Sequence, residues 1–381
     1  MKKGWQTKKL GELCDILDHK RKPITKRVRD AGEYPYYGAT GVLDHVAGYI
    51  FDEPLVLVGE DGAKWASGAN TAFAVEGKIW VNNHAHVLRP HRNSLLDKWL
   101  IYNLNHSDLT EFVSGLTVPK LNQGSLREIS VPVPPLSEQQ RIVDLLDEVL
   151  GGLATAAANT EKNLQNAHAL FESHLQSVFT QRGTGWVDRQ LASLCFEITV
   201  GHVGSMKTEY KESGVPFLRS QNIRPFEVSM ENVMFINGAF HRALKKSQLR
   251  PGDLAIVRTG YPGTAAVIPP ELPDSNCSDL VIVRPSKEVN PHFLAAFFNS
   301  AFGKQLVLGK IVGAAQKHFN ITAAKGVMLH VPPIQEQIAI IAMVNDLRDE
   351  TQHLARLYDR KLTALGALKK SLLNIAFAGE L

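Results

Sequence analysis

The sequence contains few cysteines and no long apolar segment. Its 381 residues include only three cysteines, too few and too scattered for a disulfide framework or a zinc site. Apolar runs such as Ala339 to Val344 are far shorter than the roughly 20 residues that cross a bilayer. The basic N-terminus lacks the apolar stretch of a secretory signal. These absences predict a soluble cytoplasmic protein without a membrane partner.

The charge is nearly balanced, with 42 Lys+Arg against 38 Asp+Glu and a net charge of +4. This small excess permits a polyanionic partner without requiring one, so any binding of nucleic acid must depend on local clusters of basic residues. The hydrophobic content of 44% excludes a largely disordered chain. At roughly 100–200 residues per domain, the length predicts two or three folded units.

Catalytic motifs are also missing. No phosphate-binding loop with Gly-Lys-Ser/Thr is present. The segments Val133 to Leu136 and Val331 to Ile334 lack the polar and aromatic residues of the Asn-Pro-Pro-aromatic motif with which adenine methyltransferases hold a flipped base. His45, His84 and His86 have no carboxylate or cysteine at metal-ligand spacing, so we expect structural or DNA-facing roles for them. The sequence therefore predicts a non-catalytic protein without a metal site.

The chain contains an internal repeat. Four residues near the N-terminus recur at an offset of 181: Trp5, Leu10, Leu13 and Cys14 correspond to Trp186, Leu191, Leu194 and Cys195. Further along, Val133-Pro-Pro-Leu-Ser-Glu-Gln139 corresponds to Val331-Pro-Pro-Ile-Gln-Glu-Gln337 at an offset of 198. The chain is therefore two diverged copies of one unit joined near Gly183 to Gly185, and the second copy has a net insertion. The equivalent Cys14 and Cys195 are expected to be packed in the interior.

Each copy has two parts of different character. The first part has short apolar runs that end in glycine-rich turns, such as Leu55 to Val58 and Leu254 to Val257, which predict short strands interrupted by helices. The second part follows a Pro-Pro pair and runs about 45 residues without proline, with apolar residues at 3/4 spacing. We predict an α/β (α+β) fold in which two globular domains are joined by an antiparallel two-helix coiled coil. The predicted parts are residues 1–135, 136–182, 183–333 and 334–381.

The paired Pro-Pro-x-x-Glu-Gln motifs carry a family resemblance. With the loops Gly115 to Asn122 and Gly313 to Asn320, and with the segment Phe377 to Leu381, the sequence resembles a specificity subunit of a type I DNA restriction–modification system. The resemblance covers essentially the whole chain in the order recognition domain, helix, recognition domain, helix.

The resemblance implies a function in DNA recognition. Each globular domain would be a target-recognition domain that reads one half of a bipartite asymmetric site in double-stranded DNA, and the helices would set the spacing. Two methyltransferase subunits would dock on the chain and bring S-adenosylmethionine, and restriction/translocase subunits would complete the enzyme. No cofactor is expected on this chain itself.

Basic and amide side chains in loops are the candidate DNA contacts. Arginine pairs with guanine and asparagine or glutamine with adenine, while lysines bind phosphate. The first copy offers Lys20, Arg21, Lys22, Tyr36, Tyr37, Thr40, Lys64, Asn82, Asn83, His84 and Lys120. The second copy offers Arg219, Gln221, Asn222, Arg224, Arg258, Thr259, Tyr261, Gln316, Lys317 and His318. Each residue has an alternative as a turn, strand-end or solvated loop residue, and Asn122 and Asn320 are expected to cap helices.

Two other functions remain alternatives. A stand-alone adenine methyltransferase would need the missing catalytic motifs. A coiled-coil scaffold whose β-rich ends bind proteins need not show any DNA affinity, whereas phosphate-mediated DNA binding should weaken steeply with salt.

Overall fold

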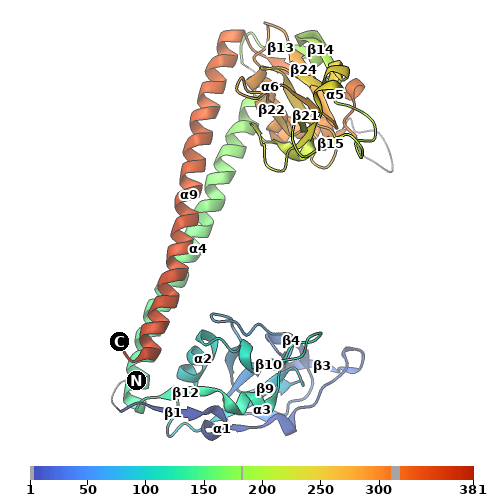
Figure 1. Cartoon of the computed structure of the whole chain (residues 1–381). Helices are drawn as coiled ribbons and strands as arrows, with labels where there is room; N and C mark the ends of the chain where they lie inside the picture. The colour runs from blue at the N-terminus through green and yellow to red at the C-terminus, as the bar shows by residue number, and fades with distance from the viewer. Residues whose placement is uncertain (1–3, 182, 310–317) are drawn as a thin grey trace. The chain divides into compact units, whose positions relative to one another are not determined.

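The computed structural model describes residues 4–181, 183–309 and 318–381, so the predicted contacts Gln316 and Lys317 lie outside the described residues. The chain divides into two compact units (Figure 1). Unit 1 comprises Met1–Glu161 and Arg360–Leu381, and unit 2 comprises Lys162–Asp359. This division passes through both long helices, and the four predicted domain boundaries stay predictions.

Unit 1 contains two four-stranded sheets. The first has the strand order β2-β9-β6-β7, all antiparallel, and the second has the order β4-β3-β8-β5. The strands of the first sheet are β2 (Cys14–Ile16), β9 (Ala85–Pro90), β6 (Leu55–Gly59) and β7 (Ala72–Val75). Those of the second are β4 (Gly41–Val46), β3 (Ala31–Gly38), β8 (Lys78–Val81) and β5 (Phe51–Asp52). A separate pair joins β1 (Gln6–Lys9) to β12 (Ser130–Val133).

Unit 2 repeats this arrangement. Its four-stranded sheet has the order β14-β24-β21-β22 and its other sheet the order β15-β19-β16-β23-β20. The first group is β14 (Cys195–Val200), β24 (Leu280–Pro285), β21 (Leu254–Val257) and β22 (Ala265–Val267). The second is β15 (Tyr210–Lys211), β19 (Met234–Ile236), β16 (Val215–Leu218), β23 (Ser275–Cys277) and β20 (Gln248–Leu249). β13 (Val187–Gln190) pairs with β25 (Met328–Val331) as β1 pairs with β12, which confirms the predicted repeat.

The central strands explain the sequence pattern. Leu55 to Val58 in β6 and Leu254 to Val257 in β21 are buried along their whole length because each strand has a neighbour on both sides and is covered on both faces. One face of β6 carries Val56 and Val58 into the core beneath α2 (Asp97–His106). The equivalent helix in unit 2, α6 (Pro291–Asn299), has Pro at its start and covers β21 and β22.

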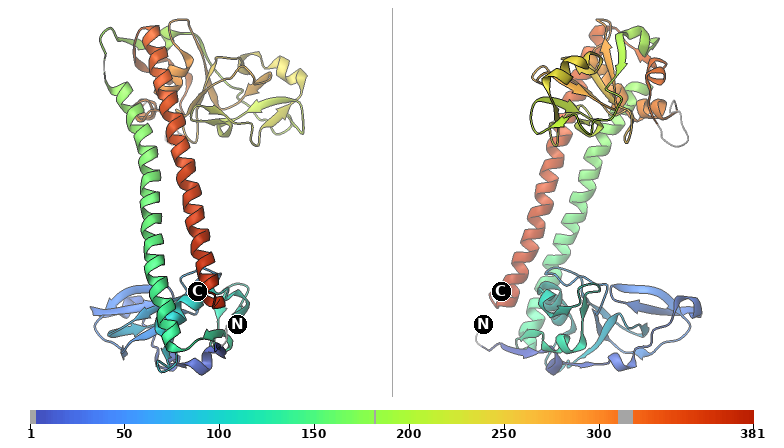
Figure 2. Two further views of the ribbon diagram at one scale, coloured as in Figure 1. Left: turned by 90° about the vertical axis from the view of Figure 1, so that its left-hand side faces the viewer. Right: turned by 45° about the vertical axis from the view of Figure 1, so that its right-hand side comes forward.

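Two long helices follow the Pro-Pro pairs as predicted: α4 (Leu136–Thr180) and α9 (Ile334–Ala378). In unit 1, Ile142 and Leu146 of α4 share a core with Leu373 and Ala376 of α9. In unit 2, the later part of α4 shares a core with the early part of α9 through residues that include Phe179 and Val344. The start of each helix therefore meets the end of the other, and the packing is antiparallel (Figure 2). None of the helices in the described ranges carries an apolar stretch that could span a bilayer.

A buried glutamine fixes the start of each long helix. Gln139 is fully buried; its Oε1 accepts a hydrogen bond from the Leu96 N–H (2.9 Å), and its Nε2 donates to the carbonyls of Ser94 and Pro134 (both 2.8 Å). Gln337 bonds in the same way to the Asn290 N–H (2.8 Å) and to two carbonyls. The glutamine of the repeated Glu-Gln motif thus satisfies backbone groups that burial would otherwise leave unpaired.

The cysteines are interior residues. Cys14 and Cys277 are buried, and Cys195 is partly buried. Burial raises the pKa of the Cys14 and Cys195 thiols to about 12, so both stay protonated and unreactive at neutral pH. The predicted packing role is confirmed for Cys14 and is only partial for Cys195.

Candidate nucleic-acid interface

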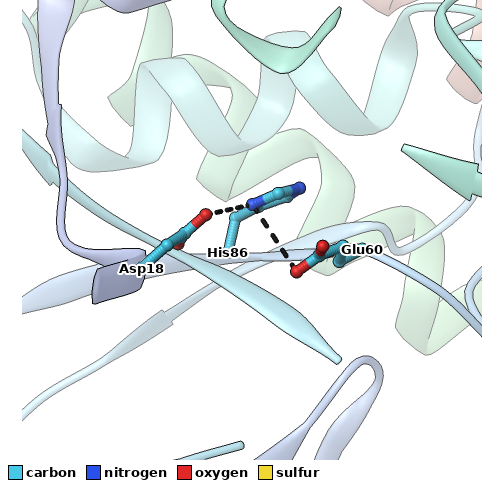
Figure 3. Close-up of side chains that lie close together, drawn as sticks. All are labelled: Asp18, Glu60 and His86. Carbon is cyan, nitrogen blue, oxygen red and sulfur yellow. Dashed lines mark hydrogen bonds and ion pairs between the residues drawn. The ribbon is translucent and has the colours of Figure 1, made fainter. Parts of the chain in front are cut away.

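A buried cluster of charged groups lies at one end of the β2-β9-β6-β7 sheet of unit 1. His86 is the second residue of β9 and is fully buried. Its Nδ1 lies 2.6 Å from a carboxylate oxygen of Asp18, and its Nε2 lies 2.7 Å from the Leu121 carbonyl oxygen. Glu60 follows β6, and its carboxylate lies 3.9 Å from the His86 Nδ1 (Figure 3). Because both ring nitrogens face acceptors, both bonds form together only when each nitrogen carries a hydrogen.

Two cations, Arg21 and Lys120, complete the cluster. Arg21 is hydrogen-bonded to Glu60 and lies 3.4 Å from Asp18, and the Lys120 Nζ lies 2.9 Å from Glu60. Burial alone would raise the pKa of both carboxyl groups. For Asp18, the hydrogen bond from His86 and the nearby charges reverse this effect and lower the pKa. For Glu60, the bonds from Lys120 and Arg21 likewise lower it. Both side chains are therefore carboxylates at neutral pH.

The cluster corrects the expectation that no carboxylate accompanies the histidines. Asp18, Glu60 and His86 place potential ligand atoms within 4.8 Å of one another, although they are far apart in the sequence. They do not fit a metal ion, because Arg21 and Lys120 already neutralise Glu60 and both His86 nitrogens are hydrogen-bonded. His45 is not part of this group. The arrangement is a salt network that positions the backbone around it.

This charged cluster joins four segments, three of which carry predicted DNA contacts. The first holds Arg21, which donates hydrogen bonds to the carbonyls of Asn83 (3.5 Å) and Ala85 (2.8 Å). The second and third meet where the Glu60 N–H donates to the His84 carbonyl (2.9 Å). The fourth begins at β11 (Lys120–Leu121), where the Leu121 N–H donates to the Glu60 carbonyl (2.8 Å). Loops that are remote in sequence are thereby brought to one end of the sheet.

The predicted residues of unit 1 occupy different environments. Five of them lie on the segments joined by the cluster and are exposed or partly exposed: Lys20, Lys22, Asn83, His84 and Lys120. Arg21 and Asn82 lie on the same segments, but Arg21 is bound in the cluster and Asn82 is buried with its Oδ1 accepting from the His84 N–H (2.7 Å). Thr40 and Lys64 are exposed on other turns.

The two tyrosines are mainly interior residues. Tyr36 is buried in β3, and its hydroxyl oxygen accepts a hydrogen bond from the Ile24 N–H (2.9 Å). Tyr37 is partly buried against Phe73, and burial raises the pKa of its hydroxyl group. These contacts explain why aromatic residues occupy this strand without any need for DNA.

Unit 2 has the same backbone frame with different side chains. The Arg258 N–H donates to the Asp279 carbonyl (3.2 Å), and the Phe319 N–H donates to the Arg258 carbonyl (3.1 Å). These bonds correspond to those of Glu60 with His84 and Leu121 in unit 1. Arg258 thus stands where unit 1 has Glu60, so the same position has the opposite charge in the two copies. Among the described residues, the buried Nε of Arg258 has no hydrogen-bond partner.

Four predicted residues of unit 2 line one cavity. The cavity has a volume of about 600 Å³ and is bordered by Gln221, Arg224, Thr259 and Tyr261. The Tyr261 side chain is 85% exposed, and the Arg224 guanidinium is paired with Glu231. Lys304 also lines this cavity. The sequence analysis missed Lys304 because a lysine within an otherwise ordinary helix gives no local signal.

The other predicted residues of unit 2 have structural contacts. Asn222 is fully buried, and its Nδ2 donates to the carbonyls of Ser229 (3.0 Å) and Glu231 (3.1 Å). The Arg219 guanidinium donates to the Asn232 carbonyl (2.9 Å). Thr259 is hydrogen-bonded to Asp279, and His318 is half-buried beside the segment that lies outside the described residues.

The predicted asparagine caps are confirmed in part. Asn320 precedes α8 (Ile321–Lys325), and its side chain accepts a hydrogen bond from the Ala323 N–H (2.8 Å). Asn122 occupies the same position before α3 (Gln123–Glu128) but makes no capping bond. Its Nδ2 instead donates to the Ser114 hydroxyl (2.7 Å), because the first copy uses this side chain to close a hairpin.

Comparisons with known proteins agree with this organisation. Residues 2–165 match the family described as type I restriction modification DNA specificity domain. A putative type I restriction enzyme specificity subunit of Haemophilus influenzae, S.HindORF215P, is 37% identical over 37% of this chain and 36% of its own length. The EcoKI specificity subunit of Escherichia coli K12 is 22% identical over 87% of this chain and 75% of its own length. The chain thus spans about a third of the first relative and three quarters of the second.

Solved structures share the fold over the whole chain. A structure described as the basis of complex assembly and conformational transition of the type I R-M system matches with a TM-score of 0.77 at 18% identity, covering 100% of this chain and 99% of its own. The HsdS subunit of Thermoanaerobacter tengcongensis matches with a TM-score of 0.60 at 18% identity, covering 100% and 98%. The family match covers the first copy, the repeat extends its frame to the second, and specificity subunits align with most of the chain. Residues 2–165 therefore carry a type I restriction modification DNA specificity domain, and the chain as a whole is similar to type I restriction enzyme specificity subunits.

Proposed function

We propose that this chain is the DNA sequence-recognition subunit of a type I restriction–modification enzyme, and that each unit reads one half of a bipartite, asymmetric site. One observation carries the proposal: the two units share a backbone frame and display different side chains on it. Glu60 and Arg258 hold equivalent positions, as do the loops that begin β9 and β24. Shared frames with different side chains suit two readers that bind different sequences.

In unit 1 the exposed lysines are the expected phosphate contacts, and Asn83 and His84 are placed to reach base edges. Lys20, Lys22 and Lys120 lie on segments joined by the charged cluster, so phosphate binding and base reading share one rigid support. In unit 2, Arg258 and the cavity residues Gln221 and Tyr261 are the corresponding candidates.

The chain itself is proposed to be non-catalytic and to act in the cytoplasm. Two methyltransferase subunits would dock on the long helices and adjacent surfaces and supply S-adenosylmethionine, and restriction/translocase subunits would join them. Exposed apolar residues on α9, including Ile338, Met343 and Leu368, support a protein partner along this helix. The helices would set the number of unread base pairs between half-sites.

Footprinting tests this proposal. The chain, co-purified with its methyltransferase subunits, should protect two short DNA segments of different sequence separated by an unprotected spacer. Binding should weaken steeply with salt, with log affinity falling linearly with log salt concentration. A complex that protects no sequence, with no salt-dependent affinity for DNA, would contradict DNA recognition and favour a protein scaffold.

A further inference from the structure

A short hairpin in unit 1 ends in exposed apolar side chains. β10 (Val113–Ser114) pairs with β11, and the five residues between them, 115–119, form the tip. Leu116 is completely exposed, at 106% of its reference area, and Val118 is 65% exposed. The tip has no charged residue. Two apolar side chains held in water at the end of a hairpin contribute nothing to the core of this unit.

The base of the hairpin is firmly held. Leu121 is fully buried, its N–H donates to the Glu60 carbonyl, and its own carbonyl accepts from His86. Asn122 closes the base through its bond to the Ser114 hydroxyl (2.7 Å). Gly115 has φ +98°, and a Cβ there would lie 2.5 Å from the Val118 carbonyl oxygen, so only glycine permits this turn. The charged cluster thus fixes the root from which the apolar tip extends.

The surroundings of the hairpin indicate what the tip meets. Lys120 stands at its base and is joined through Glu60 to Arg21, next to the exposed Lys20 and Lys22. Phosphates drawn to these lysines would bring a DNA groove to a tip that offers only apolar side chains. Proteins that deform DNA insert leucine, proline and similar side chains between base pairs at such places.

We propose that Leu116 and Val118 form an apolar wedge that inserts at a base step in the half-site read by unit 1 and unstacks it. The inference rests on the proposed function and adds to it an apolar contact that makes no hydrogen bond to a base. At the offset of 198, the second copy has Ala314 and Gln316 at these positions, which lie outside the described residues. Only the first copy therefore has two large apolar side chains at these positions, so only one half-site should be unstacked.

The test uses the complex of this chain with its methyltransferase subunits. The DNA is a duplex that contains the sequence which this complex methylates. 2-Aminopurine, whose fluorescence rises when stacking is lost, is placed at each position of both half-sites in turn. Apart from the target adenines that the methyltransferase subunits flip, the wild-type complex should raise fluorescence at one step in one half-site only. The double variant L116A/V118A should lose this signal and bind about tenfold or more weakly, as expected when one leucine side chain is no longer buried.

Thr117→Ala is the matched control, since it shortens a polar side chain of the same tip and should behave as wild type. All three proteins should unfold at the same temperature, because the altered side chains are exposed. Unchanged fluorescence and affinity in L116A/V118A would overturn the wedge. Unchanged DNA binding with loss of the methyltransferase subunits would overturn it too, and would assign the tip to a protein contact. A wild-type complex that selects no sequence would instead refute the proposed function.

Discussion

Replacing His86 with leucine tests whether the charged cluster holds the DNA-facing segments of unit 1 together. The change keeps a buried side chain of similar size and removes both hydrogen-bond donors. It removes a bond to the Asp18 carboxylate, typically about 1.5–3 kcal/mol, and a bond to the neutral Leu121 carbonyl, typically about 1 kcal/mol. Asp18 keeps the Val87 N–H (2.9 Å) and Gln123 (3.0 Å) as partners, so it is not left unpaired. We expect a loss of about 3 kcal/mol in the free energy of unfolding of unit 1.

Tryptophan fluorescence can follow this unit selectively. Four of the five tryptophans, Trp5, Trp65, Trp80 and Trp99, belong to unit 1. For a unit of this size, about 3 kcal/mol corresponds to a decrease of roughly 6–12 °C in the midpoint of thermal unfolding.

His84→Leu is the matched control for His86→Leu. His84 lies two residues earlier, its side chain is 48% exposed, and it pairs with Asp61 at the surface. Its replacement should cost under about 1 kcal/mol of stability while weakening DNA binding. If His86→Leu is as stable as His84→Leu, the charged cluster is not what holds these segments.

Four other changes follow from the structure. Arg258→Ala should relax selection at one half-site by about 1–3 kcal/mol and leave the other intact, as read from the methylated sequences; uniform weakening on all DNA would identify a phosphate contact. Gln139→Leu should destabilise unit 1 by about 3 kcal/mol in denaturant, since three backbone groups lose their partner, with Gln337→Leu as its counterpart in unit 2. Asp18 has a lowered pKa in the folded chain, so its stabilising contribution is present above the usual carboxyl range and is lost as the pH falls through its folded pKa. In pH-dependent melts the deficit of Asp18→Asn should therefore begin to shrink below about pH 4 and vanish only once the pH is below the folded pKa, and a constant deficit would contradict this. Deleting one heptad from each long helix removes about 10 Å of helix, the length of about three base pairs, and should shorten the unread spacer without altering the half-sites; an unchanged spacer in the methylated sequence would refute the helices as its determinant.

The sequence was sufficient to predict the repeat, the helices and the central strands. These depend on patterns within one segment: the Pro-Pro pairs mark the helix starts at Leu136 and Ile334, and uninterrupted apolar runs mark β6 and β21. The Trp5 and Trp186 motifs align because both copies use the same strand pairing. The bonds between Gln139 and the backbone of Ser94 and Leu96 could not be predicted, because these residues lie in another segment.

The candidate interface was predictable only as a set of segments. Asp18, Glu60 and His86 are brought together by strand pairing and loop closure, and nothing in their spacing indicates a cluster. Tyr36 and Asn222 looked like base-reading residues because polar and aromatic side chains follow strands in binding loops. In the structure their polar atoms bond to backbone groups, which a sequence cannot distinguish from a free side chain.

The central claim is that the two units of this chain recognise two different DNA sequences. Sequencing of methylated bases in a host that expresses this chain with its methyltransferase subunits should reveal one adenine-methylated motif made of two half-sites with different sequences, separated by a fixed unread spacer. A continuous motif, or no methylation beyond that of the host, would contradict the account.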